Sequence, residues 1–170
     1  MVFIITLISL LVLPAAIGAK DIAYLYNGNL WLTDAAFSSH QALLDTTRNW
    51  MTNLKWSPDG RRLGFISEKG LEVYDFDDST VHNFGDYDRT NYLNSSSSFD
   101  WSPDGTHLVA WKSDSLNNRR LYRLPYHHPG DAVLLTPGDS VKATVSYWSP
   151  RGDRILYHDS KTMTARIITL

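Results

Sequence analysis

One short motif occurs three times in the sequence, and this repeat constrains the fold more than any other feature. Trp-Ser-Pro-Asp-Gly stands at 56–60 and 101–105, and Trp-Ser-Pro-Arg-Gly stands at 148–152. The copies are 45 residues (56 to 101) and 47 residues (101 to 148) apart. Self-similarity at a period of roughly 20–50 residues indicates a repeat architecture, in which each repeat is one supersecondary unit stacked on its neighbours.

The order of residues in the motif predicts a tight turn between two strands. Ser, Pro and Gly stand at the first, second and fourth positions of a type I turn, where Pro fixes φ and Gly tolerates positive φ. A type I turn followed by a left-handed Gly is a common hairpin loop. The segments after the turn, 63–66, 108–111 and 155–158, are apolar on both faces. Such a strand is covered on both sides, so each is predicted to lie inside a stack of sheets.

The Ser-Pro-Asp-Gly turn at the end of an apolar strand, repeated every forty-odd residues, resembles the WD-like propeller repeat of TolB. The same repeat occurs in the propeller domains of prolyl-oligopeptidase-type peptidases. The resemblance covers residues 22 to 170 and implies an all-β fold, a partial or small β-propeller of about three to four four-stranded blades. It implies no single activity, because propellers host unrelated functions.

Strand composition and turn residues divide the chain into two complete and two partial blades. The partial blade 20–50 holds predicted strands at 22–26, 30–33 and 41–46. The blade 51–90 holds strands at 53–56, 62–67, 71–76 and 81–84. The blade 91–138 holds 99–101, 107–112, 120–124 and 133–135, and the partial blade 139–170 holds 144–148, 154–158 and 165–170.

The first blade lacks its inner strand and the last lacks its outer strand, whereas a propeller closes with about four to eight blades. Three alternatives follow: a truncated or degenerate gene, a small closed four-bladed ring, or two chains that complete one ring. Unpaired strand edges and uncovered terminal blades favour association. We therefore expect self-association, as a homo-oligomer that completes the propeller.

Composition excludes several classes of protein. The length of 170 residues fits one domain, and a formal charge of −2 gives no basic surface for nucleic acid. The sequence has no Cys. Disulfides, thiolate metal sites, a Cys nucleophile and a lipid-modified N-terminal Cys are therefore excluded.

The N-terminus resembles a targeting segment. Residues 2–13 are almost continuously apolar, and Pro14 and small residues follow up to Ala19. This pattern is typical of a secretory signal peptide, and it predicts a signal peptide at 1–19, propeller repeats at 20–170 and a periplasmic or secreted location without an integral membrane span after cleavage. No Lys or Arg precedes the apolar run. An uncleaved anchor and a buried first strand are therefore the alternatives.

The motif residues are predicted to be structural, and no catalytic, cofactor-binding or metal-binding residue is assigned. They are Trp56, Pro58, Asp59, Gly60, Trp101, Pro103, Asp104, Gly105, Trp148, Pro150 and Gly152. We expect the Trp side chains to pack between blades, with ligand stacking as the alternative, and the Asp side chains to accept local backbone hydrogen bonds. Arg151 in the third copy argues against a metal site built from all three motif carboxylates.

Four other patterns carry weaker signals. The acidic region formed by Asp75, Asp77, Asp78, Asp86 and Asp88 lacks the Gly and the distal Glu of an EF-hand loop, so solvated loop charges are expected. His127-His128 and His158-Asp159 lack the spacing of zinc ligands, and no Gly-x-Ser-x-Gly elbow anchors a hydrolase triad. Arg151-Gly152-Asp153 spells an integrin-recognition tripeptide, but it coincides with the motif turn. Asn94-Ser95-Ser96 is a formal glycosylation sequon.

These observations predict an exported, non-catalytic protein-interaction module that needs no cofactor. Resemblance to TolB implies a cell-envelope scaffold with a protein partner that no residue identifies. The alternative is the propeller of a prolyl-oligopeptidase-type serine peptidase that lacks its catalytic domain. A neighbouring reading frame for a hydrolase would favour the peptidase, and neighbouring envelope proteins would favour the scaffold.

Overall fold

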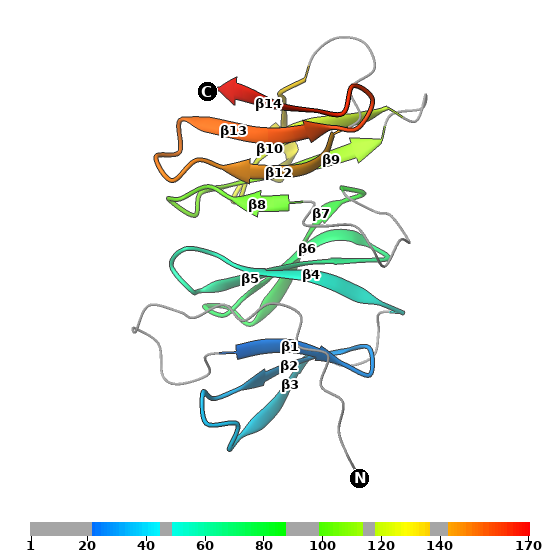
Figure 1. The fold of residues 1–170 in the computed structure, drawn as a ribbon. Helices are drawn as coiled ribbons and strands as arrows, with labels where there is room; N and C mark the ends of the chain where they lie inside the picture. The colour runs from blue at the N-terminus through cyan, green and yellow to red at the C-terminus, as the bar shows by residue number, and fades with distance from the viewer. Residues whose placement is uncertain (1–21, 45–48, 88–98, 114–117, 137–142) are drawn as a thin grey trace.

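The computed structural model describes residues 22–44, 49–87, 99–113, 118–136 and 143–170. Within these ranges the chain forms fourteen strands and one short 3₁₀ turn (Pro129–Asp131), arranged as four separate antiparallel sheets. The sheets stack in chain order, from the blue first sheet to the orange and red last sheet (Figure 1). Such stacking is that of neighbouring blades, and it confirms the predicted all-β fold, a partial β-propeller.

The two middle sheets have four strands each, joined in chain order by hairpins. The second sheet contains β4 (Met51–Trp56), β5 (Arg62–Ser67), β6 (Gly70–Asp75) and β7 (Thr80–Gly85). The third contains β8 (Phe99–Trp101), β9 (His107–Ser113), β10 (Arg119–Pro125) and β11 (Val133–Leu134). All eight strands predicted for these two blades are present, and their ends lie within two residues of the prediction.

The two end sheets have three strands each. The first contains β1 (Ile22–Tyr26), β2 (Asn29–Thr33) and β3 (His40–Leu44), and the last contains β12 (Ala143–Trp148), β13 (Arg154–Asp159) and β14 (Thr164–Thr169). The predicted strand at 41–46 runs beyond the described part of β3, because 45–48 lie outside the described residues. Two complete and two partial blades are therefore present.

Three hydrophobic clusters fill the three spaces between successive sheets. In each space the forward face of one sheet, which points toward the next sheet in the chain, packs on the backward face of that next sheet. Pairs of buried members from facing sheets are Leu32 and Phe65, Val73 and Phe99, and Val109 and Ile155. The core is thus divided into layers, and each middle sheet contributes both of its faces.

The strands that follow the motif turns differ in how they are covered. β5 and β9 are buried along both faces. On β13, Ile155 and Tyr157 are buried against the third sheet, but Leu156 on the forward face is 42% exposed. The prediction that all three strands are covered on both sides is therefore wrong for β13. Within the described residues no further sheet lies on that face.

Gly64 on β5 marks a close approach between the second and third sheets. A Cβ at position 64 would lie 2.7 Å from Cε2 of Phe99, and the Phe99 side chain is fully buried. We expect Gly64→Ala to lower the free energy of unfolding by about 1–3 kcal/mol, because overpacking a well-filled core forces side chains off their rotamers. Urea unfolding measures this change.

Gly130→Ala is the matched control, because nothing lies within 4 Å of a Cβ at position 130. Adding Phe99→Leu to Gly64→Ala should restore part of the lost stability, since the smaller side chain makes room. If Gly64→Ala proves as stable as Gly130→Ala, the close approach of these two sheets is wrong.

Candidate functional site

The three motif turns share one backbone geometry. In each turn the Gly N–H donates to the Ser carbonyl at 2.9 Å, and the pairs are Gly60 and Ser57, Gly105 and Ser102, and Gly152 and Ser149. The three Gly residues have φ of 69°, 69° and 76°, in the left-handed region that a residue with a Cβ enters only with strain. Each Ser hydroxyl also accepts the N–H of the residue five positions later, at 2.9–3.0 Å. The motif therefore closes each hairpin in the same way.

A carboxylate accepts from the Ser hydroxyl in every turn, but its position in the sequence differs. In the first two copies the motif Asp accepts at 2.5 Å, Asp59 from Ser57 and Asp104 from Ser102. In the third copy Ser149 Oγ donates to Asp153 Oδ1 at 2.8 Å, because position 151 is Arg. Asp153 thus replaces the missing motif carboxylate. The Arg-Gly-Asp tripeptide is part of this turn.

Hydrogen bonds favour the ionised form of the motif carboxylates. The Ser102 hydroxyl and the N–H of Thr106 lower the pKa of Asp104 to about 2. Burial raises the pKa of Asp59, but the hydrogen bonds from the Ser57 hydroxyl and the Arg61 N–H outweigh it, and the pKa is lowered. Both turns therefore carry a negative charge at neutral pH.

The motif turns lie one above another along one edge of the stack (Figure 1). A Cβ on Gly105 would lie 3.7 Å from Cδ of Pro58, and a Cβ on Gly152 would lie 3.7 Å from Cδ of Pro103. The rings of Pro58 and Pro103 therefore lie beside the Gly of the next turn, where an added Cβ would touch them. We call the surface formed by 57–60, 102–105 and 149–152 the turn edge.

The three motif Trp side chains occupy equivalent places. Each pairs across its hairpin with the first apolar residue of the next strand, Trp56 with Leu63, Trp101 with Leu108 and Trp148 with Ile155. The Trp56 ring stacks on Phe76 at 5.2 Å between centroids, and the Trp101 ring lies 5.9 Å from that of Tyr126. All three belong to or pack against the clusters between sheets, where they stabilise the stack.

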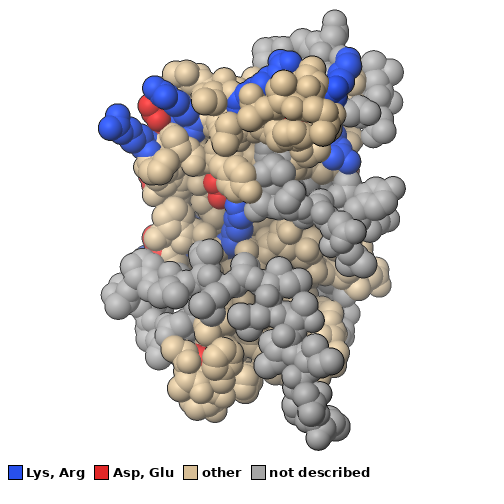
Figure 2. All heavy atoms as spheres, viewed as in Figure 1, with Lys and Arg blue, Asp and Glu red and all other residues tan. Residues whose placement is uncertain are grey.

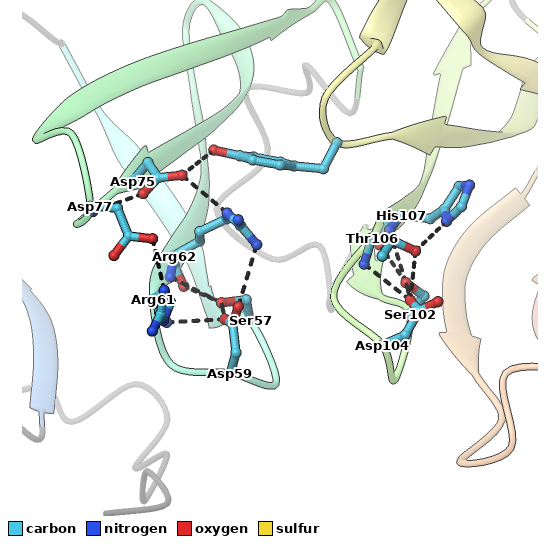
Figure 3. A network of polar contacts seen from close by, with 11 residues as sticks. Ser57, Asp59, Arg61, Arg62, Asp75, Asp77, Ser102, Asp104, Thr106 and His107 are labelled. Carbon is cyan, nitrogen blue, oxygen red and sulfur yellow. Dashed lines mark hydrogen bonds and ion pairs between the residues drawn. The ribbon is translucent and has the colours of Figure 1, made fainter. Parts of the chain in front are cut away.

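A polar network beside the turn edge joins the second sheet to the third (Figure 3). Arg62 Nε donates to Asp75 Oδ2 at 3.0 Å, and the hydroxyl of Tyr126 donates to the same oxygen at 2.7 Å. The guanidinium carbon of Arg62 lies 4.2 Å from the centre of the Tyr126 ring. The side chains of Arg62 and Asp75 are only 14% and 10% exposed. The hydrogen bond from Tyr126 and the packing of its ring on Arg62 therefore tie the third sheet to a nearly buried ion pair of the second.

This network alters the titration of both acidic groups. Burial raises the pKa of Asp75, but hydrogen bonds from Tyr126, the Asp77 N–H and Arg62 outweigh it, so the pKa is lowered. Burial and the hydrogen bond to Asp75 raise the pKa of Tyr126. At neutral pH the carboxylate is therefore ionised and the phenol keeps its proton as a donor.

Acid should weaken the contact between these two sheets. The pKa of Asp75 is lower in the folded chain than its usual value of about 3.9. The ionised carboxylate therefore stabilises the fold fully above about pH 3.9, and this stabilisation is lost as pH falls through the folded pKa. We expect the difference in Tm between wild type and Asp75→Asn to be large at pH 7 and to narrow below about pH 3.9. The other carboxylates are common to both proteins and cancel in this comparison. A difference that stays constant with pH would contradict the assignment.

A second polar chain crosses the stack along the strands that precede the motif turns. Lys55 Nζ donates to Asp100 Oδ1 at 2.9 Å, and Asp100 Oδ2 accepts the N–H of Trp148 at 2.9 Å. The Lys55 ammonium lies 5.4 Å from the centre of the Tyr147 ring. Lys55, Asp100 and Tyr147 each stand directly before a motif Trp, so they occupy one position of the repeat. Alignment of the three repeats was the signal that could have found this set from the sequence.

The expectation of solvated loop charges in the acidic region is wrong for Asp75, which is 7% exposed at the end of β6 and is bound by Tyr126 of the next sheet. Asp77 and Asp78 make local contacts. Asp77 pairs with Arg61 at 3.3 Å, and Asp78 accepts the N–H of Thr80 at 2.9 Å. Among the residues that the structure describes, no three His, Asp or Glu side chains form a group that could hold a metal ion. Asp88 and the sequon at Asn94 lie outside the described residues.

The two His groupings lie on different sheets. His127 follows β10, and its ring meets the Tyr126 ring edge-on at 4.9 Å between centroids. His158 lies on β13, and its Nδ1 is 3.1 Å from the hydroxyl of Thr144. Asp159 is 2% exposed and accepts the N–H of Lys161 at 3.0 Å. The structure gives each grouping a local contact and no shared site.

A hollow of about 270 Å³ opens at the turn edge between the third and fourth sheets. Its walls include Asp104, His107, Arg123, Trp148, Arg151 and Leu170. Nε of Arg123 and Nε1 of Trp148 are buried, and within the described part of the chain neither has a hydrogen-bond partner. Sequence reasoning missed Arg123 and Leu170, because neither belongs to the motif. This hollow is the candidate binding site.

The described ranges contain no helix of the length and apolar character that a membrane span requires. No protein-family model and no curated protein matches the chain. Solved structures match in fold at low identity, so the comparison concerns architecture alone.

TolB from Acinetobacter baumannii has a TM-score of 0.56 and 14% identity, over 89% of this chain and 38% of that one. A putative TolB from Agrobacterium tumefaciens has a TM-score of 0.57 and 15% identity, over 84% of this chain and 53% of that one. An oligogalacturonate lyase in complex with manganese has a TM-score of 0.58 and 18% identity, over 84% of this chain and 41% of that one. The chain thus spans from 38% to 53% of the length of these proteins. The motif turns, the stacked antiparallel sheets and these likenesses together give the chain the fold of a TolB-like β-propeller.

Proposed function

We propose that the chain is an exported, non-catalytic protein-interaction module that serves as a cell-envelope scaffold. The observation that carries the proposal is the turn edge, where Pro58 and Pro103 each lie beside the Gly of the next turn and buried contacts tie the sheets beneath. Loops held on a rigid scaffold are where recognition usually takes place. The likeness to TolB and the apolar segment at 2–13 support an envelope location.

Site-specific crosslinking tests the contact surface. A photoreactive amino acid at Arg151, which is exposed on the turn edge, should form an adduct with a specific envelope protein in living cells. Lys69, which is exposed in the hairpin between β5 and β6, at the other end of the sheet from the motif turns, is the matched control and should give no such adduct. Equal adducts from both positions, or none from Arg151, would count against the turn edge as the interaction surface.

Export has its own test. We expect the protein in the periplasmic or secreted fraction, with a mature N-terminus at or near Lys20. N-terminal sequencing of the fractionated protein reads this out. A protein that keeps residues 1–19 and stays in the cytoplasm would overturn the export part of the proposal.

The forward face of the last sheet should bind a second copy of the chain. Tyr147, Leu156 and Ile167 lie side by side on it and are 44%, 42% and 64% exposed. In the described part of the first two sheets and their connections Asp and Glu outnumber Lys and Arg by eight to four, whereas in the last two Lys and Arg outnumber Asp and Glu by eight to five. Figure 2 shows Lys and Arg gathered over the upper, C-terminal sheets. Head-to-tail contact therefore places the more acidic half of one chain beside the more basic half of the other.

We expect the mass measured by light scattering to rise with protein concentration, and Leu156→Lys to weaken this association at least tenfold. Met163→Lys is the control, because Met163 is 75% exposed in the turn before β14 and lies outside this apolar row. A monomer at all concentrations, or equal association of the two variants, would contradict the prediction.

A further inference from the structure

The hollow beside Trp148 has a counterpart one interface earlier. In the last three sheets the residue directly after the third strand donates its N–H, at 2.9 Å, to the carbonyl of the residue directly before the strand that follows the motif turn. The donors are Phe76, Tyr126 and Leu170, and the acceptors are Arg61, Thr106 and Asp153. Leu170 therefore stands in the last sheet where Tyr126 stands in the third. Both lie beside their motif Trp, Tyr126 at Trp101 and Leu170 at Trp148.

Between the second and third sheets this place is filled. Tyr126 is only 5% exposed, its ring lies against the guanidinium of Arg62, and its hydroxyl donates to Asp75. Between the third and fourth sheets, Leu170 has no ring and no hydroxyl to offer. The hollow of about 270 Å³ is found there, so its shape follows from a Leu in place of a Tyr.

Among the side chains that line the hollow, Arg outnumbers Asp by two to one. Arg123 and Arg151 line it, and within the described residues no ion pair is formed by either. Asp104 is the only carboxylate side chain among the lining residues. Burial and the nearby Arg123 lower the pKa of His107, while Asp104 opposes this. With His107 neutral at pH 7, the lining side chains carry two positive charges and one negative charge. Within the described residues, the buried N–H groups of Arg123 and Trp148 have no hydrogen-bond acceptor.

We propose that this hollow binds an aromatic carboxylate with a single ring. The ring occupies the place that Tyr126 fills in the preceding interface, against Trp148 and Leu170, and the carboxylate accepts from Arg123. Arginine binds carboxylates through paired, charge-assisted hydrogen bonds and also packs on aromatic faces. Sites for drug-sized ligands measure roughly 300–1,000 Å³, so a hollow of about 270 Å³ suits one ring and its acid group. This inference goes beyond the proposed function and does not depend on it.

Isothermal titration of the purified protein with 4-hydroxyphenylacetate tests the proposal. We expect binding by wild type, and binding at least tenfold weaker by Arg123→Gln and with the uncharged 4-hydroxyphenylacetamide. Arg61→Gln is the matched control and should bind as wild type does, because Arg61 is exposed and does not line the hollow. Absence of binding to wild type at millimolar concentration, or equal binding of the acid and the amide, would overturn the proposal.

Leu170→Tyr is a second variant, and it separates a loss of binding from a loss of folding. It should fill the hollow as Tyr126 fills the earlier one, keep the melting temperature of wild type and abolish binding. If this folded variant binds as well as wild type, the ligand does not bind in the hollow.

The tripeptide Gly-Gly-Tyr, with a free or an amidated C-terminus, distinguishes two sources of an aromatic carboxylate, a peptide C-terminus and a small molecule. Tighter binding of the free tripeptide than of 4-hydroxyphenylacetate assigns the hollow to a peptide C-terminus, and the reverse assigns it to a small molecule.

Discussion

Trp101→Ala is expected to lower the free energy of unfolding by about 3–5 kcal/mol, because truncating a buried Trp removes apolar contacts and leaves a cavity. Trp101 is 5% exposed and belongs to the cluster between the second and third sheets. Its Nε1 also donates at 3.2 Å to the carbonyl of Lys55 in the preceding sheet. Since a small domain is stable by only about 5–15 kcal/mol, this variant should be close to unfolding. Urea unfolding followed by Trp fluorescence and circular dichroism measures the change.

Trp148→Ala is the matched control, since it removes the same side chain from the third copy of the motif. Trp148 is half-buried and its Nε1 has no hydrogen-bond partner within the described residues, so we expect a smaller loss. Trp101→Phe should lie between these two, because it keeps an aromatic ring near Tyr126 and loses the hydrogen bond. Equal losses for Trp101→Ala and Trp148→Ala would show that the position in the stack does not matter.

The strands and the turns follow from local chemistry, which is why the sequence predicts them. Pro58 fixes φ, Gly60 takes φ of 69°, and the short loop that contains them sets Trp56 opposite Leu63 across the hairpin. Every predicted strand is present in the described chain, although the one at 41–46 extends past the described part of β3. None of these features requires knowledge of a distant residue.

The contacts between sheets could not be predicted in the same way. Tyr126 and Asp75 are 51 positions apart, and their hydrogen bond depends on how two sheets stack. Likewise, the hollow lies where Leu170 stands in the place that the larger Tyr126 takes in the preceding interface. Alignment of the repeats shows which residues are equivalent, but only the packed sheets show which of them leave space. Leu156 is a further example. Its apolar side chain is typical of a strand that is covered on both faces, but it is 42% exposed because no described sheet packs on that face.

Asp75→Ala should cost about 3 kcal/mol, at the lower end of the range for breaking a buried ion pair, because both partners retain slight exposure. The loss has two parts. Arg62 would remain nearly buried with Asp59 as its remaining carboxylate partner among the described residues, at 3.4 Å. The hydroxyl of Tyr126 would lose its acceptor at a position that is 5% exposed. An unsatisfied buried donor costs more than the hydrogen bond itself contributes.

Asp77→Ala controls for the loss of a carboxylate from the same loop. Asp77 is 51% exposed and pairs with the equally exposed Arg61, so we expect a change below about 0.5 kcal/mol. A double-mutant cycle of Asp75→Ala with Tyr126→Phe isolates the contact between the sheets, since residues in one network show coupling energies of about 0.5–3 kcal/mol. Additive losses would mean that Asp75 and the Tyr126 hydroxyl stabilise the protein separately. Coupling would show that the hydrogen bond from Tyr126 to Asp75 links the third blade to the Arg62–Asp75 ion pair of the second blade, beside the turn edge.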